Sequence, residues 1–358
     1  MGQTQKIGCA LACAVISFVA MGVRLPAQNL TYTKGQNIAP AFEGWEHDAD
    51  GSKYFVFGYM NRNWAEEIDI APGPENGFTP GQADQGQPTH FMPRRNRFVF
   101  RVPVPKNFTE KDELIWTITS HGVTEKAWAT IRADYLLDDV VKASETGALG
   151  AGTSNPEVRS NKAPTVKIDG TRTLTAKVGQ PLTLTAKVAD DGIPKPRNVS
   201  PVAALFGGSN GRGGAPGAAA PGAAGAGRGG NEDLAAAAEA AGISQAQLAQ
   251  LQAARRNPSM TPPTRITVGK VTGLHLSWFV YRGAGNVTFT PEQIKTWEDT
   301  RAGANSPWAP LWAPPVLPAD GKIVVQATFD APGTYVLRGL ADDGALFGGD
   351  NVTVTVTR

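Results

Sequence analysis

Short stretches of alternating apolar and polar residues recur along the first part of the chain. In residues 97–104, the apolar side chains of Phe98, Phe100, Val102 and Val104 occupy every second position and would share one face of a strand. The neighbouring runs are rich in β-branched and aromatic residues, are separated by turn signals and have no helical period. The pattern is typical of an antiparallel sandwich. It predicts strands at 54–59, 97–104, 114–119 and 126–131.

A first β domain is therefore expected over residues 36–142. One connection in it, Ala71 to Pro93, is rich in Gly and Pro and is too long for a plain hairpin, so it is either functional or a clamp across the sheet edge. His90 lies near its end, and Arg94 and Arg95 follow it. These three side chains could form an anion-binding point, or the arginines could simply be solvated beside a strand.

After a linker of low apolar content at 143–162, the alternation returns and predicts a second β domain over residues 163–358. Trp278 shares one strand face with Leu274, Leu276 and Val280, so its side chain is expected in the core. The strands are predicted at 165–168, 173–177, 182–188, 271–281, 322–329, 333–340 and 351–357.

An insertion at about 197–264 interrupts the second domain. From Gly207 to Gly230 all but four of the residues are Gly, Ala or Pro, a composition that cannot bury enough apolar surface to offset ordering and therefore predicts disorder. Residues 231–256 follow with an Ala-rich helical pattern, which begins at the N-cap residue Asn231 and contains a second capping box that would divide it into two helices.

Several stretches of the second domain follow the pattern of a known family: 161–166, 188–196, 276–278, 331–338, 341–346 and 350–356. On these residues the domain resembles a bacterial PKD-like repeat of the immunoglobulin-like class, over about 161–192 and 270–358. The resemblance implies that Trp278 is the buried core tryptophan and Tyr335 the corner tyrosine. The insertion departs from the family, which usually has a short loop there.

Stretches of the first domain, 44–45, 57–63 and 86–95, are similar to the N-terminal region of exported proteins of soil bacteria such as acidobacteria. This resemblance carries no activity and no site. Together with the strand pattern, the two resemblances predict an all-β fold. It would consist of two immunoglobulin-like antiparallel β-sandwich domains, the second interrupted by a Gly/Ala-rich insertion that is partly disordered and partly helical.

The first 27 residues have the layout of a secretory signal peptide. Lys6 precedes an uncharged apolar run at 7–23, and Ala27 offers the favoured cleavage point, with Gly22 as an alternative. The run could instead be an uncleaved anchor, or Cys13 could be a lipoprotein cysteine. Both cysteines, Cys9 and Cys13, lie in this leader, so the exported chain would have no disulfide, no thiol catalysis and no cysteine-based zinc site.

Charge excludes one class of function. The 358 residues have a net charge of +2, and the two surplus cations, Lys6 and Arg24, lie in the leader. A neutral mature chain argues against a nucleic-acid partner held by phosphate contacts. The four histidines are scattered without metal-binding spacing, and no nucleophile or phosphate-loop motif is present, so no cofactor is expected apart from calcium.

Calcium is considered because acidic pairs stand at predicted turns, where carboxylate oxygens can bind a hard cation. The best candidates are the two pairs of the second domain, which a sandwich could bring to one end: Asp190, Asp191, Asp342 and Asp343. Ordinary Asp-Gly turn chemistry explains the same residues without a metal.

A second kind of candidate binding residue is aromatic. Trp297, Trp308 and Trp312 lie in a Pro-rich segment that does not alternate like a strand. Such rings could stack on sugars or bind a partner protein, or they could fold back over the sandwich edge.

These features together predict an exported, periplasmic or extracellular protein of the cell envelope. Its function would be non-catalytic binding or scaffolding, with an envelope protein or a glycan as partner. The alternative is a secreted carbohydrate-active enzyme or its accessory module, whose cleft would use Glu66, Glu67 and Asp69.

Overall fold

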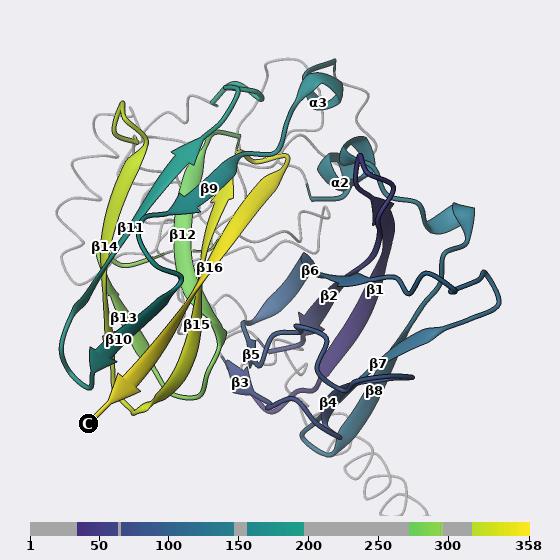
Figure 1. Ribbon diagram of the computed structural model, residues 1–358, viewed down its shortest axis with the longest axis horizontal. Helices are drawn as coiled ribbons and strands as arrows, with labels where there is room; N and C mark the ends of the chain where they lie inside the picture. The colour runs from purple at the N-terminus through teal and green to yellow at the C-terminus, as the bar shows by residue number, and fades with distance from the viewer. Residues whose placement is uncertain (1–33, 64–65, 147–155, 197–271, 294, 296–316) are drawn as a thin grey trace, which may run out of the picture. The chain divides into compact units, whose positions relative to one another are not determined.

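A computed structural model describes residues 34–63, 66–146, 156–196, 272–293, 295 and 317–358, which fold mainly into β-strands (Figure 1). They belong to one compact unit that spans Thr33–Arg358. The predicted leader, the insertion and the three tryptophans at 297, 308 and 312 lie outside the described residues. No helix in the described ranges is long and apolar enough to cross a membrane.

The N-terminal strands form two three-stranded sheets and a small two-stranded one. The first sheet has the order β1-β2-β6, the second β4-β7-β8 and the third β3-β5, and all of their pairs are antiparallel. The bounds are β1 (Ile38–His47), β2 (Lys53–Asn61), β3 (Ile68–Asp69), β4 (Asn76–Thr79), β5 (His90–Phe91), β6 (Arg94–Pro103), β7 (Leu114–Ser120) and β8 (Val123–Ala129). The four strands predicted for this region are confirmed.

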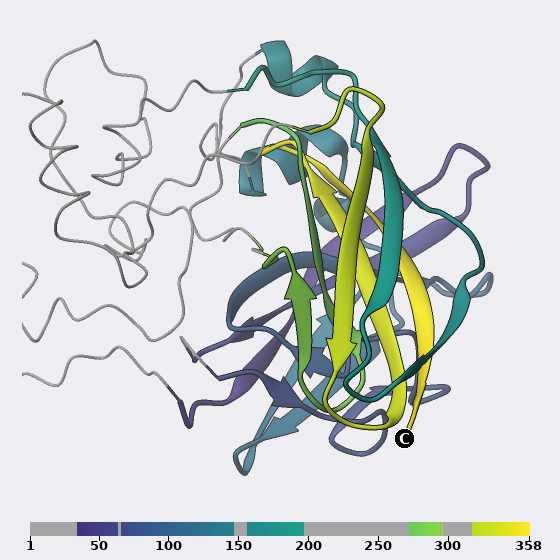
Figure 2. The same ribbon diagram turned by 90° about the vertical axis from the view of Figure 1, so that its left-hand side faces the viewer.

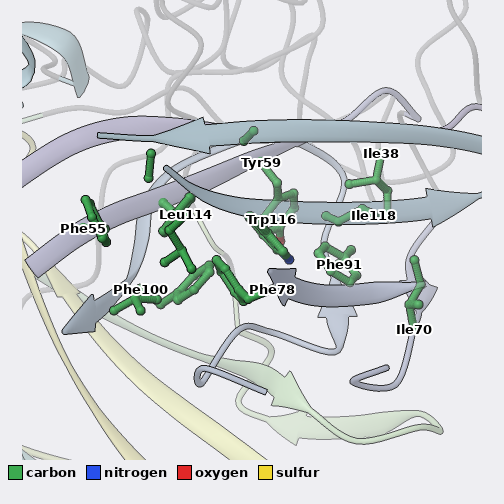
Figure 3. Packing of buried hydrophobic residues seen from close by; sticks show 14 of the residues in the cluster. Ile38, Phe55, Tyr59, Ile70, Phe78, Phe91, Phe100, Leu114, Trp116 and Ile118 are labelled. Atoms are coloured by element: carbon green, nitrogen blue, oxygen red, sulfur yellow. The ribbon is translucent and has the colours of Figure 1, made fainter. Parts of the chain in front are cut away.

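An aromatic core fills the space between these sheets (Figure 3). Trp116 of β7 is fully buried, stacks on Phe78 with ring centroids 5.8 Å apart, and meets Phe100 edge to face at 5.0 Å. Phe57 of β2 stacks on Phe100, its partner in the same sheet, at 5.5 Å, and both rings contact Trp116 of the other three-stranded sheet. Aromatic rings bring large apolar surface into the core and prefer these offset and edge-on contacts, which explains why short strands with few aliphatic residues suffice.

The predicted alternation of β6 is wrong at one residue. Phe98 does not share the face of Phe100 and Val102 but packs on the opposite side of the sheet with Val56 and Leu137. The cause is a register shift, because Phe57 pairs with Phe100 whereas Tyr59 pairs with Asn96, which leaves extra residues on β6. A β-bulge of this kind reverses which face a side chain occupies, and a periodicity of two cannot reveal it.

The C-terminal strands form two four-stranded sheets, β10-β16-β15-β12 and β13-β14-β11-β9, seen edge-on in Figure 2. Every pair is antiparallel except β10 with β16. The bounds are β9 (Thr165–Ile168), β10 (Thr173–Lys177), β11 (Leu182–Ala189), β12 (His275–Arg282), β13 (Val287–Thr290), β14 (Lys322–Phe329), β15 (Gly333–Asp342) and β16 (Phe347–Thr357). The predicted strands are confirmed, and β13 is an additional one.

Side chains from both sheets meet in a mainly aliphatic core, so this part is a β-sandwich. Trp278 is 2% exposed and Tyr335 is fully buried, as predicted. The Tyr335 hydroxyl lies 3.0 Å from the carbonyl oxygen of Ala331, four residues upstream, and 2.9 Å from that of Ala284. A tyrosine that bonds to the backbone just before its own strand has the geometry expected of a corner tyrosine.

Along the chain, three short helices lie between β8 and β9: η1 (Ala133–Tyr135), α2 (Asp139–Thr146) and α3 (Pro156–Ser160). Ala143 of α2 is fully buried against Ala345 and Leu346, and Asn161, directly after α3, is also buried. The described ends of the predicted linker therefore pack on the C-terminal strands, because a small Ala side chain fits closely there. The proposed domain boundaries stay a prediction.

Candidate ligand-binding cavity

A small cavity, with a volume of about 30 Å³, lies where β6 meets β12, β15 and β16. Such a volume holds one or two water molecules, or the end group of a larger ligand. Its walls combine aromatic rings with cationic side chains, and no Asp or Glu is among the lining residues. The basic members are His90, Arg97, Lys295 and Arg338.

The backbone is irregular on both sides of the cavity. The β6 bulge contributes Arg97, Phe98 and Val99, and Phe98 has φ +50°, a left-handed conformation that is unusual for a bulky residue. The opposite strand, β12, has its own register shift at Tyr281, between Val280 and Arg282. Bulges and strained residues are over-represented at binding and catalytic sites, where they re-aim side chains.

The bulge in β6 also depends on the residue of β2 against which it packs. Gly58 of β2 lies under it, and a Cβ at this position would clash with the Glu43 side chain and the carbonyl oxygen of Asn96 and would be 3.0 Å from the Cα of Arg97. Any larger residue would push β6 away. The path of β6 beside the cavity therefore requires glycine at position 58.

Arg338 is the central cation of the cavity. Its guanidinium lies over the ring of Tyr281, 3.7 Å from the centroid, and donates to the side-chain oxygen of Asn351 at 2.8 Å and to the carbonyl oxygen of Val99 at 2.5 Å. These partners are neutral oxygens and a π face, with no carboxylate among them. Burial lowers the pKa of Arg338 because desolvation penalises the charged form.

His90 stands at the rim of the same cavity but is already engaged. Its Nδ1 lies 2.8 Å from Asp69 Oδ1 and its Nε2 lies 3.2 Å from Glu67 Oε2. Both ring nitrogens thus have acidic partners. Glu66 accepts from the backbone N–H of Gly35 at 2.6 Å and lies 3.3 Å from His121.

Of the three residues of the predicted anion-binding point, only His90 lines the cavity, and the anion site itself stays a prediction. Arg95 pairs with Glu43 at 2.6 Å, and neither Arg94 nor Arg95 lines the cavity. In their place the fold brings in Arg97, Lys295 and Arg338, which the sequence pattern did not single out. Lys295 donates to Asn96 Oδ1 at 2.9 Å. Residues 97 and 338 are 241 positions apart, and only the sheet packing could have joined them.

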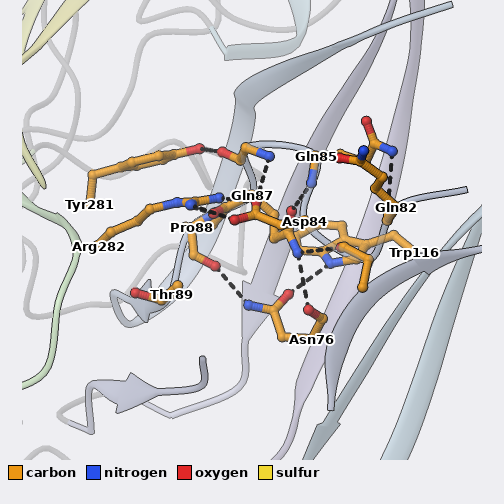
Figure 4. Close-up of polar contacts among 12 residues, drawn as sticks. Asn76, Gln82, Asp84, Gln85, Gln87, Pro88, Thr89, Trp116, Tyr281 and Arg282 are labelled. Atoms are coloured by element: carbon orange, nitrogen blue, oxygen red, sulfur yellow. Dashed lines mark hydrogen bonds and ion pairs between the residues drawn. The ribbon is translucent and has the colours of Figure 1, made fainter. Parts of the chain in front are cut away.

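The long connection 71–93 is bonded to β12, the edge strand of the sheet β10-β16-β15-β12, as its predicted role of a clamp across a sheet edge requires (Figure 4). Arg282 forms a two-pronged ion pair with Asp84, at 2.6 and 3.0 Å, and its Nε donates to the carbonyl oxygen of Gln87 at 2.7 Å. The hydroxyl of Tyr281 donates to the carbonyl oxygen of Gly86 at 2.6 Å. These contacts fix β12 against the loop.

A buried amide network holds the loop itself. Asn76 donates to the carbonyl oxygens of Ile70 and Pro88, at 3.0 and 2.9 Å, and accepts from Trp116 Nε1 at 3.0 Å. Gln87 donates to the carbonyl oxygen of Asn76 at 3.0 Å. Each of these buried polar groups has a partner, so the loop is tied to the aromatic core rather than lying loose on it.

The acidic turns lie elsewhere, at one end of the C-terminal sandwich. Asn161 donates to Asp343 Oδ2 at 3.0 Å, and the backbone N–H of Lys162 donates to Asp191 Oδ2 at 3.2 Å, so residues 161 and 162 connect the two predicted pairs. Asn161 Oδ1 and Asp190 Oδ1 are buried and have no hydrogen-bond partner among the described residues.

Burial changes the acidity of this cluster. It raises the pKa of Asp343 to about 6, against the opposing effect of the backbone N–H groups of Leu346 and Ala345, and it also raises the pKa of Asp190. Asp342 is buried and accepts from the backbone N–H of Gly344. No group of three or more His, Cys, Asp or Glu in the described part of the chain is placed to hold a metal ion. A calcium ion would therefore need amide or backbone oxygens as well.

Comparisons with known proteins give no family. No family model matches the chain, and no curated protein matches it. Among solved structures, an S-layer protein, SbsC, matches with 8% identity and a TM-score of 0.20, over 90% of this chain and 28% of that chain. Its fragment of domains 4 and 5 matches with the same identity and TM-score, over 98% of that fragment. Such TM-scores carry no argument about shared fold or function.

Proposed function

We propose that this chain is an exported, non-catalytic binding protein of the cell envelope, and that the cavity at the β6 bulge is its ligand site. The observation that carries the proposal is the pair of bulges, in β6 and at Tyr281, which border one small cavity lined by aromatic and basic side chains from two sheets. Export to the periplasm or the cell exterior is supported by the signal-like residues 1–27.

The domain architecture is part of the proposal. The corner geometry of Tyr335 and the buried Trp278 support a PKD-like, immunoglobulin-like second domain, with an insertion at about 197–264. The two three-stranded sheets of the N-terminal part support a second sandwich. The ligand would be an envelope protein or a glycan.

Binding is favoured over the enzyme alternative by the positions of the acidic residues. Glu67 and Asp69 both face His90, and Glu66 is held by a backbone N–H. Glu67 and Asp69 therefore hold the His90 side chain in the wall of the cavity. A glycosidase needs two carboxylates facing each other across a substrate.

A co-sedimentation experiment tests the proposal. The full-length protein is incubated with isolated envelope, and with its glycan and protein fractions, and saturable binding to one fraction is expected. A Leu340→Trp variant, which fills the cavity, should lose this binding while its circular dichroism stays unchanged. Unchanged binding by a folded Leu340→Trp variant would place the ligand elsewhere.

Export has its own test. N-terminal sequencing of the native envelope protein should begin at Gln28 or within a few residues of it. An intact Met1 on a membrane-bound species would support the anchor alternative instead.

Calcium is a second proposed ligand, at the end of the sandwich. The two buried oxygens Asn161 Oδ1 and Asp190 Oδ1 favour it, because each lacks a hydrogen-bond donor among the described residues and a nearby cation would supply the missing partner. A calcium-dependent rise of the melting temperature, absent in an Asp190→Asn variant, is the expected result. Equal melting temperatures with calcium and with a chelator would exclude the ion.

A further inference from the structure

Three lysines lie side by side on the outer face of the sheet β13-β14-β11-β9. Lys187 of β11 is directly opposite Lys167 of β9 on one side and Lys322 of β14 on the other, and these strands are neighbours in Figure 1. All three residues are exposed, whereas the alternate residues Ile168 and Ala186 belong to the buried core. We call Lys167, Lys187 and Lys322 the lysine row.

The lysine row opposes the stability of the sheet. Like charges directly opposite each other on neighbouring strands repel and weaken the pairing. Lys167 and Lys187 form no ion pair within the described ranges of the chain, and Lys322 Nζ lies 4.0 Å from Asp169 Oδ2, where both side chains are about half-exposed. One such exposed pair contributes little. A local arrangement that works against folding is typical of a functional surface, and here its charge fits a negatively charged partner.

From this we propose that the lysine row binds an acidic polysaccharide, whose chain would lie across β9, β11 and β14. Neighbouring strands are about 4.8 Å apart, so the row offers evenly spaced ammonium groups to a chain that carries carboxylates along its length. The proposal goes beyond the ligand site at the β6 bulge, because no residue of this sheet lines that cavity.

The side chains around the lysine row favour a glycan over a membrane. Thr183 and Thr185 of β11 and Gln326 of β14 lie on the same outer face, and their hydroxyl and amide groups can exchange hydrogen bonds with sugar hydroxyls. Proteins that lie on a membrane also insert aromatic or large apolar side chains. On the four strands of this sheet, Val324 is the one exposed large apolar residue, and none of the exposed ones is aromatic.

Binding of polygalacturonate to the full-length protein tests the proposal. Calorimetric titration at low salt should show binding that weakens as sodium chloride is added, because salt screens exposed charges. Dextran, an uncharged polysaccharide, should not bind. Vesicles that contain phosphatidylglycerol present an anionic membrane, and their binding should not depend on the lysine row.

Variants of the lysine row locate the site. The triple variant Lys167→Gln, Lys187→Gln, Lys322→Gln should weaken polygalacturonate binding at least about tenfold. Lys187→Gln should have the largest effect of the three single changes, because Lys187 is the middle of the row. The melting temperature of the triple variant should be unchanged or higher, since the repulsion between facing lysines is removed. A lower affinity in a variant of this stability reports binding and not unfolding.

Two controls accompany the triple variant. Lys106→Gln, Lys111→Gln, Lys126→Gln removes the same charge from exposed positions outside the row and should bind polygalacturonate like the wild type. Leu340→Trp fills the cavity at the β6 bulge and should also keep this binding. Polygalacturonate binding that survives while Leu340→Trp still binds the envelope would refute the proposed cavity site and leave the lysine row standing.

The proposal is overturned if polygalacturonate does not bind, if dextran binds equally well, or if the triple variant and its charge-matched control lose the same affinity. Vesicle binding that requires the lysine row would overturn it as well and would identify a membrane as the partner. Loss of polygalacturonate binding in a folded Leu340→Trp variant would place the acidic glycan in the cavity instead.

Discussion

The two halves of the protein bury their cores in different ways. The N-terminal sheets pack aromatic rings, with Trp116 at the centre, and anchor a long loop through the buried amides of Asn76 and Gln87. The C-terminal sandwich packs mainly aliphatic side chains between long, regular ladders. Irregular strands are tolerated in the first region because large rings fill uneven space, and its cavity-lining bulge lies there.

This comparison predicts that the largest losses of stability come from the two central tryptophans. Trp116→Ala and Trp278→Ala should each lower the free energy of unfolding by about 3–5 kcal/mol, since each leaves a large hole in a close-packed core. Denaturant unfolding measures the loss. The control is Trp128→Ala on β8, which is 52% exposed and should change stability by less than about 0.5 kcal/mol. Equal losses for all three variants would mean that burial does not govern these sites.

A milder substitution separates the two cores. Trp116 Nε1 donates to Asn76, whereas Trp278 Nε1 is buried with no partner among the described residues. Trp116→Phe leaves the Asn76 oxygen without its donor, but Trp278→Phe removes an unsatisfied N–H group. The first should therefore cost about 1–3 kcal/mol more than the second. Chemical unfolding of the pair tests this, and a larger loss at Trp278 would refute the difference.

Asp343 makes the C-terminal sandwich sensitive to pH. Burial raises its pKa from an ordinary 3.8 to about 6, so the folded state holds the proton more tightly than the unfolded chain. The stability that this group contributes is complete below about pH 3.8 and is lost as the pH rises through about 6. Asp343→Asn, which cannot ionise, should therefore gain stability relative to the wild type at pH 7 but not at pH 4. Melting curves of both proteins at the two pH values decide, and a constant difference would contradict the assignment.

The smallest effect is expected where the loop meets β12. The Asp84 carboxylate is half-exposed, and its two bonds to Arg282 lower its pKa. Its contribution is present above the ordinary pKa of 3.8 and is lost as the pH falls through the lowered folded value. Because solvent screens the pair, Asp84→Asn should cost only about 0.2–1 kcal/mol near neutral pH. A cost as large as that of a core tryptophan would show that this ion pair, rather than the aromatic core, holds the loop.

The same contrast explains what the sequence could predict. The alternation of β11, β14 and β16 is regular, and the predicted ranges there agree with the structure to within a few residues. In the N-terminal part β1 was missed, because Pro40 and Gly44 interrupt its pattern. The short strands β3, β4 and β5 were missed as well, and β4 lies inside the predicted long connection. The face of Phe98 was wrong because a bulge breaks the period. Alternation along the sequence thus predicts regular strands, but it does not predict bulges or strands that contain Pro and Gly.

The cavity could not be predicted for a related reason. Its cations come from β6, β15 and the chain after β13, and only tertiary packing brings them together. The sequence did indicate His90 and the end of the long loop, which form one wall. It favoured Arg94 and Arg95 over Arg97, since neighbouring arginines form a conspicuous pair, and it offered no signal for Arg338.

The most direct test of the central claim is a binding curve of the protein with isolated envelope, measured beside the cavity-filling Leu340→Trp variant. The account predicts saturable binding by the wild type and its loss in a Leu340→Trp variant whose circular dichroism is unchanged. Equal binding by the wild type and the folded variant would contradict it.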